Sequence, residues 1–146
     1  MLQQQRTQAD FGGLSGGGGP GAPVVGGAYY AGGQETIQGV ALTPGWVVLA
    51  EFDLDVLPAS AVLDAIGLVS GAALQLSIKL YDVTLAADVA GSTLTSVSLT
   101  GQRMTSADIV AGLVLNNRYQ IWAECTGGAG PADFAVVRYA VLALAP

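Results

Sequence analysis

The sequence predicts an all-β fold, an antiparallel β-sandwich of jelly-roll type with an extended glycine-rich N-terminal arm. From about Glu35 onward the apolar residues recur with a period of two, the pattern of strands with one buried face. Turn signals follow one another at short spacing, and no segment carries the apolar period of a long helix. A chain of 146 residues is long enough for one domain with a core. We therefore expect residues 35–146 to form the sandwich domain and residues 1–34 to form the arm.

Glycine determines the character of the predicted arm. Twelve of the 21 glycines lie before residue 40, and glycine loses more backbone entropy on ordering than any other residue. The arm is therefore expected to be flexible in free solution and to become ordered by docking on another protein surface. The side chains predicted to dock are Phe11, Leu14, Val24, Val25, Tyr29 and Tyr30.

The first half of the predicted domain carries three strands. The segment 45–57 is predicted as a half-buried strand, residues 61–69 form a weaker alternating run, and Ser70-Gly71 is a tight turn into the clearest strand, 72–81. In the first of these strands the acidic residues form a predicted outer face, and the apolar residues form the inner one. The inner residues are Trp46, Val48, Phe52, Leu54 and Val56, and the outer ones are Glu51, Asp53 and Asp55.

The second half predicts shorter elements and then two long strands. Residues 82–89 and 92–99 are expected to be strands separated by Ala90-Gly91, and Gly101-Gln102 marks a turn. Residues 105–115 fit either a short helical turn opened by Ser106 and Asp108 or a loop with short extended pieces, and we favour the loop. Asn116-Asn117 indicates a turn because asparagine tolerates positive φ. Strands are expected over 118–125 and 133–145, which makes about eight strands in all.

Composition restricts the partners. Hydrophobic residues make up 51% of the chain and charged residues 11%, with a mean hydropathy of +0.52, whereas globular domains carry about 25% charged residues. Another protein surface is therefore expected to cover part of this one. No run reaches the roughly 20 apolar residues of a membrane span, so we expect no membrane. The net charge of −6 and the five scattered basic residues predict no nucleic acid partner.

The residues for common catalytic chemistry are missing. The chain has no histidine and one cysteine, so we predict no catalytic site, no metal site and no cofactor. Cys125 falls in an alternating run and is interpreted as buried and inert. Glu51 and Asp53 alternate on one strand face roughly 7 Å apart, a spacing that would suit a glycosidase pair, but we interpret these acids as a solvated face. Calcium binding by them, or by Asp82 and Asp88, is a weaker alternative because no EF-hand spacing occurs.

Three aromatic residues are candidates for an interface or a ligand. Trp46 lies at the start of the predicted strand 45–57, Trp122 lies in phase with polar residues, and Tyr81 lies in phase with Lys79. A tryptophan that points outward among polar neighbours packs on a subunit, on the arm or on a ligand. We favour the interface over sugar binding because the whole chain is rich in apolar residues.

Part of the chain resembles a known group of domains. The stretch from Leu74 to Val141 contains Lys-Leu-Tyr-Asp-Val-Thr at 79–84, Val-Ala-Gly-Ser-Thr-Leu-Thr at 89–95 and Asn-Arg-Tyr-Gln-Ile-Trp-Ala-Glu at 117–124. It is similar to jelly-roll domains of tailed-bacteriophage virion proteins of the head-decoration, head-fibre or tail-fibre type. The resemblance implies a homo-oligomer, frequently a trimer, whose N-terminal arm attaches to other virion proteins such as the major capsid protein. It implies no catalytic residues.

The sequence thus supports three hypotheses. The first is a non-catalytic structural protein on the virion surface, in the head or the tail, anchored by its arm. The second is a carbohydrate-binding module of tail-fibre type that recognises a surface glycan with Trp46, Tyr81 and Trp122. The third, a sandwich hydrolase using Glu51 or Asp53, is the weakest.

Overall fold

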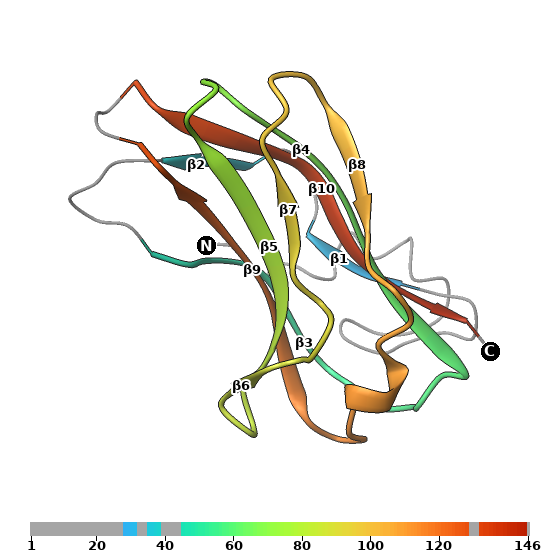
Figure 1. Ribbon diagram of the computed structural model, residues 1–146. Coiled ribbons are helices and arrows are strands. Elements are labelled where there is room, and N and C mark those ends of the chain that lie inside the picture. Colours follow the sequence, from blue (N-terminus) through green and yellow to red (C-terminus); the bar gives the residue numbers. More distant parts are fainter. Residues whose placement is uncertain (1–27, 32–34, 39–44, 129–131, 146) are drawn as a thin grey trace.

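The computed structural model describes residues 28–31, 35–38, 45–128 and 132–145, and these form two packed antiparallel sheets (Figure 1). The predicted antiparallel sandwich is thereby confirmed. Sheet A has the order β1-β10-β4-β8, with β2 also pairing with β10; sheet B has the order β3-β9-β5-β6, with β7 also pairing with β5. The strands of sheet A are β1 (Ala28–Ala31), β2 (Glu35–Gln38), β4 (Ser60–Val69), β8 (Gln102–Thr105) and β10 (Phe134–Ala145). Those of sheet B are β3 (Val47–Asp53), β5 (Gln75–Asp82), β6 (Ala87–Asp88), β7 (Leu94–Ser96) and β9 (Arg118–Thr126).

The core lies between the two sheets because the long strands of both sheets turn apolar side chains inward. β9 buries every second residue from Tyr119 to Cys125, and β5 buries Leu76, Ile78 and Leu80 against them. Sheet A contributes a matching inner face from β4 and β10. Cys125 is buried in this core as predicted, and burial raises the pKa of its thiol. The core residues contributed by sheet A are Ala61, Leu63, Ala65, Val69, Ala135, Val137, Ala140, Leu142 and Leu144.

Part of the predicted arm belongs to the sheet. β1 lies within residues 1–34 and pairs with the second half of β10, with Tyr29 opposite Leu142 and Tyr30 opposite Val141. The paired part of the chain therefore begins no later than Ala28, and not at Glu35. The other predicted docking residues lie outside the described residues; they are Phe11, Leu14, Val24 and Val25.

Two segments depart from their predicted strands. β3 ends at Asp53 and contains an irregularity between Val48 and Ala50, which shifts the phase so that Val48 is exposed while Phe52 is buried. Val56, predicted on the inner face, lies beyond the strand and is 53% exposed. The strands predicted over 82–89 and 92–99 are also shorter than expected, because beyond the end of β5 at Asp82 these ranges hold only β6 and β7.

Local hydrogen bonds explain those shorter elements. A turn separates β5 from β6, and Ala86 adopts φ 56° in it. Buried Ser92 then pairs with Leu80 through its side chain, as its hydroxyl accepts from the Leu80 N–H at 3.0 Å and donates to the Leu80 carbonyl at 3.2 Å. The hydroxyl takes the place of a backbone partner, so the chain continues along β5 without a regular strand between β6 and β7.

The ambiguous stretch 105–115 contains one short 3-10 helix, η3 (Val110–Gly112). Asp108 holds it against β4, because one carboxylate oxygen accepts from the Ala61 N–H at 2.9 Å and from the Val110 N–H at 3.0 Å. These two bonds lower the pKa of Asp108. The stretch is therefore mostly loop, as favoured, and it also contains the short helical turn that was the alternative. The predicted turn at Asn116 is confirmed by its φ of 70°.

Candidate functional site

The three aromatic side chains singled out in the sequence meet on the outer face of sheet B. Trp122 of β9 and Tyr81 of β5 stack at a ring-centroid distance of 3.9 Å and an angle of 17°. Trp46, just before β3, was predicted on the inner face, but it lies on the outer face, 6.3 Å from Trp122 with a tilt of 38°, because the irregularity in β3 reverses the alternation before it. The alternation of β5 and β9 turns Tyr81 and Trp122 outward, and the sheet order places β3 beside β9. We call these three residues the aromatic cluster.

Lys79 lies inside the aromatic cluster. Its ammonium is 4.2 Å from the ring centroid of Trp46, 5.1 Å from that of Trp122 and 5.9 Å from that of Tyr81, distances at which a cation is attracted to an aromatic face. It also forms an ion pair of 2.7 Å with Asp88. The lysine lies on the outer face, in phase with Tyr81, yet only 10% of its side chain is exposed because the rings cover it.

A polar rim borders the aromatic cluster. The Trp122 indole N–H donates to Gln120 at 2.7 Å, and the Gln120 amide donates to Glu51 at 2.7 Å. Further along, Arg118 binds Asp53 through two bonds of 2.8 and 3.3 Å. Such a face can hold a flat apolar surface against the rings while the rim exchanges hydrogen bonds with hydroxyl groups.

The carboxylates do not assemble into catalytic or metal-binding chemistry in the described part of the chain. Glu51 and Asp53 are engaged with Gln120 and Arg118, and within the described ranges no group of three His, Cys, Asp or Glu residues could hold a metal ion. Asp82 accepts hydrogen bonds from Asn117 and from the Leu85 N–H, and Asp88 pairs with Lys79. In the same ranges no helix is long and apolar enough to cross a membrane.

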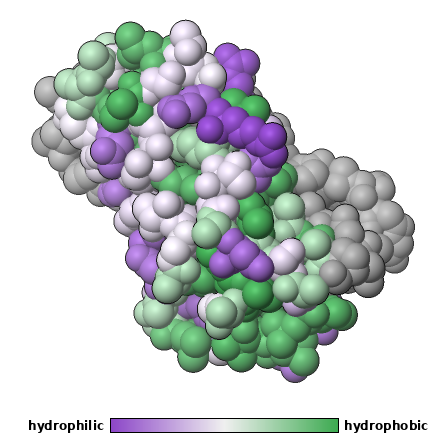
Figure 2. Space-filling view, turned by 45° about the vertical axis from the view of Figure 1, so that its right-hand side comes forward, coloured by the Kyte–Doolittle hydropathy of each residue, from purple (hydrophilic) through white to green (hydrophobic). Residues whose placement is uncertain are grey.

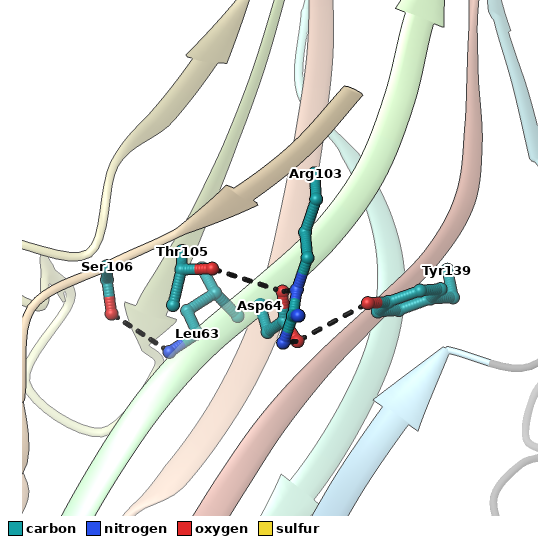
Figure 3. A network of polar contacts seen from close by, with 6 residues as sticks. All are labelled: Leu63, Asp64, Arg103, Thr105, Ser106 and Tyr139. Atoms are coloured by element: carbon teal, nitrogen blue, oxygen red, sulfur yellow. Dashed lines mark hydrogen bonds and ion pairs between the residues drawn. The ribbon is translucent and has the colours of Figure 1, made fainter. Parts of the chain in front are cut away.

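A second polar cluster lies on the outer face of sheet A and was missed in the sequence (Figure 3). Asp64 of β4 is 9% exposed and receives two hydrogen bonds from Arg103 of β8, at 3.0 and 2.8 Å. Thr105 donates to it at 3.4 Å and Tyr139 of β10 at 3.3 Å. The hydrogen bonds and charge of Arg103 hold the pKa of Asp64 below its usual value of 3.8.

This second cluster fastens three strands to one another. The register shift of β10 between Val137 and Tyr139 lets both Val137 and Ala140 face the core, with Tyr139 left to reach Asp64. A carboxyl with a lowered pKa is ionised near neutral pH and cannot serve as the general acid of a glycosidase. We therefore assign the Asp64 cluster to stability.

One end of the sandwich is apolar. Three loops converge there: the loop after β3, the turn between β5 and β6, and the loop before β9. Each exposes two large hydrophobic side chains, with exposed fractions from 36% to 61%. Figure 2 shows hydrophobic surface gathered at this lower end of the molecule. We call the six residues the apolar end; they are Val56, Leu57, Val83, Leu85, Val114 and Leu115.

The sequence did not single out the apolar end. Its residues are far apart along the chain, and an apolar residue at the end of a strand is not distinguishable from a core residue by its pattern. An open depression of about 480 Å³ lies beside it, lined by Asp53, Asp55, Val83, Thr84, Asn116 and Arg118.

Comparison with known proteins identifies the fold. No protein-family model and no curated protein matches the chain. Among solved structures, a chain of the infectious bursal disease virus T13 particle superposes with a TM-score of 0.53 at 15% identity, covering 80% of this chain and 31% of the viral one. The VP2 subviral particle of the same virus gives a TM-score of 0.52 at 16% identity, with coverages of 80% and 32%. The present chain therefore spans about a third of these viral chains.

A carbohydrate-binding structure shares the same sandwich. The xylan-binding module CBM15 gives a TM-score of 0.50 at 15% identity and covers 81% of this chain and 96% of its own. At such identities the likeness establishes the fold alone, a sandwich found both in virus particles and in carbohydrate-binding modules.

Proposed function

We propose that this chain is a non-catalytic structural subunit on the surface of a virus particle, a decoration or head-fibre subunit of a tailed bacteriophage that works as a homo-oligomer. The observation that carries the proposal is that ten large hydrophobic side chains of the described residues are at least 36% exposed, in a sequence with only 11% charged residues. Monomeric soluble proteins rarely expose large contiguous apolar patches. The fold shared with chains of a virus particle supports the same reading. The resemblance to phage virion domains suggests a trimer.

The first prediction concerns the mass in solution. Light scattering coupled to size exclusion is expected to give a mass near three times the 14.7 kDa of the chain. The physical reason is that association removes the exposed apolar side chains from water. At a protein concentration of about 100 μM, a complex with a Kd well below that concentration is mostly assembled. The mass of a single chain at this concentration would overturn the proposal.

The arm is the proposed attachment to the particle, through the major capsid protein. A deletion that tests it should end at residue 27, because Ala28–Ala31 is strand β1. The deletion is expected to leave the number of subunits per oligomer unchanged and to abolish cosedimentation with the particle. Undiminished cosedimentation would show that attachment lies elsewhere.

A second candidate function is recognition of a neutral surface glycan by the aromatic cluster. The specific observation that favours it is the set of three half-buried rings bordered by Gln120, Glu51 and Asp88 on one sheet face. Lys79 and Arg118, cations of this face, are already paired with Asp88 and Asp53. An acidic sugar would have to displace those pairs, so we propose a neutral glycan.

Trp122→Ala is expected to weaken glycan binding about fivefold or more, because a stacked ring contributes about 1 kcal/mol. The measurement is a glycan array with neutral and sialylated members, followed by titration calorimetry on the glycans that bind. Leu99→Ala, 56% exposed in the wild type and on another loop, is the control and should bind like the wild type. Absence of signal for the wild type on every glycan would remove this candidate.

A further inference from the structure

We infer that the apolar end is the surface through which copies of this chain contact one another. The inference rests on the proposed self-assembly and names its interface. Three observations support it: the apolar end is held rigid by buried hydrogen bonds, its size suits a protein contact, and its charge distribution suits a second copy.

Buried polar groups connect the three loops of the apolar end. The Leu54 N–H donates to the Asn117 carbonyl at 3.0 Å, and the Asn116 N–H donates to the Leu54 carbonyl at 2.7 Å. Asp82, 2% exposed, accepts from the Asn117 amide at 2.8 Å and from the Leu85 N–H at 2.9 Å. The backbone that carries the exposed hydrophobic side chains is therefore held in place, and the loops lose little conformational entropy when a partner covers them.

The third loop is held from the core. The Val114 N–H donates to the hydroxyl of fully buried Tyr119 at 2.7 Å. Leu115 follows directly, and both side chains stay more than 40% exposed. The hydrogen bond from the buried tyrosine fixes this loop with two large hydrophobic side chains in water. Such exposure is unfavourable unless another surface covers the side chains.

The size of the apolar end suits a protein contact. Six half-exposed valine and leucine side chains present on the order of 400 Å² of apolar surface, a size at which exposed patches mark interaction sites. That is about half of the ~800 Å² that each partner buries in a standard interface. The polar residues of the adjacent depression, such as Asp55, Thr84 and Asn116, supply the polar rim that interfaces have around an apolar centre.

Charge favours a second copy over a lipid surface. Within segments 54–57, 83–86 and 113–117 the only charged residue is Asp55, and neighbouring Arg118 is paired with Asp53. Binding to anionic lipid requires clusters of lysine or arginine, and the apolar end offers none. Two copies meeting at this end bring together nearly uncharged surfaces, so the net charge of −6 on each chain opposes the contact only weakly.

The test compares two charge-matched double variants of the full chain. Leu57→Asp with Leu85→Asp places two carboxylates on the apolar end, where the wild-type side chains are 48% and 61% exposed. Val97→Asp with Leu99→Asp places two carboxylates on similarly exposed side chains, 60% and 56%, at the opposite end. That loop lies near the end of β4, since the Val69 N–H donates to the Ser98 carbonyl.

We expect the first variant to be monomeric by light scattering at concentrations where the wild type is oligomeric, with association weakened at least tenfold. The second variant should keep the wild-type mass. Circular dichroism and thermal unfolding check that each variant folds, and the milder single variant Leu85→Ser, at an exposed turn position, should also weaken association.

The outcomes separate this inference from the proposed function. An oligomeric wild type with an oligomeric Leu57→Asp, Leu85→Asp variant overturns the interface and leaves self-assembly standing. Dissociation of both double variants overturns the interface as well, because added charge at any position would then suffice. A monomeric wild type overturns the proposed assembly, and the inference with it.

Discussion

Tyr119→Ala is expected to lower the free energy of unfolding by about 4 kcal/mol, the range measured when large buried aromatic side chains are truncated. Tyr119 is fully buried, and its ring lies 5.9 Å from that of Phe52, between the two sheets. Its hydroxyl receives the Val114 N–H and donates weakly to the Val114 carbonyl at 3.4 Å. Truncation would leave a cavity and release the loop that carries part of the apolar end. Urea unfolding followed by tryptophan fluorescence measures the loss.

Tyr119→Phe separates the two contributions. It keeps the ring and removes the hydroxyl, so the expected loss is about 1 kcal/mol, the net value of one hydrogen bond. Amide exchange at Val114 should become faster. A Tyr119→Ala variant within 1 kcal/mol of the wild type would contradict the placement of this residue in the core.

Alkaline pH tests the same residue. Burial, the largest cause, raises the pKa of Tyr119 from 10.0 to about 12. The folded state therefore holds the proton more tightly than the unfolded chain. The contribution of Tyr119 protonation to the free energy of unfolding is complete below pH 10 and is lost as the pH rises to about 12. Tyr119→Phe should lack this part of the alkaline loss.

Asp64→Asn is expected to lower the free energy of unfolding by about 2 kcal/mol at pH 7, because hydrogen bonds to a charged group contribute about 1.5–3 kcal/mol. We take the lower part of that range because the Arg103 side chain is 67% exposed and solvent screens the pair. The substitution keeps the volume of the side chain but removes the negative charge that accepts the two hydrogen bonds from Arg103. Thr105→Val, which removes only the 3.4 Å bond, is the control and should cost a few tenths of a kcal/mol.

The effect of Asp64 should depend on pH in the acid range. Its pKa is lowered in the folded state, so the unfolded chain takes up the proton first as the pH falls. The contribution of the ionised Asp64 to the free energy of unfolding is complete above the ordinary pKa of 3.8. It is lost as the pH falls from there through the lowered pKa of the folded state. The difference between wild type and Asp64→Asn should therefore narrow as the pH falls from neutrality to values below 3.8. An equal difference at both ends of that range would contradict the role of the ionised carboxylate.

Some features of the candidate site were readable in the sequence. The phase of Trp122 with Gln120, and of Tyr81 with Lys79, placed these side chains on an outer face, because alternation in a strand is a local property. Their meeting was not readable, since it depends on β5 and β9 being neighbours in register. The aromatic rings cover Lys79 because of that register, which places Lys79 directly opposite Trp122.

Other features had no local signal at all. Asp64 lies in an apolar run of β4, and its partners Arg103 and Tyr139 are 39 and 75 residues away in sequence. Val48 was assigned to the wrong face because one irregularity in β3 reverses the alternation before it. Neither a distant partner nor a bulge is encoded in the period of a single segment.

The sequence by itself determined the antiparallel sandwich, the buried state of Cys125 and the outward phase of Trp122, because each follows from alternation within one strand. The tertiary structure decided which side chains of different strands meet, and so formed the aromatic cluster, the Asp64 cluster and the apolar end. The physical reason is that pairing between strands joins residues far apart in the chain, and its register is set by the whole core.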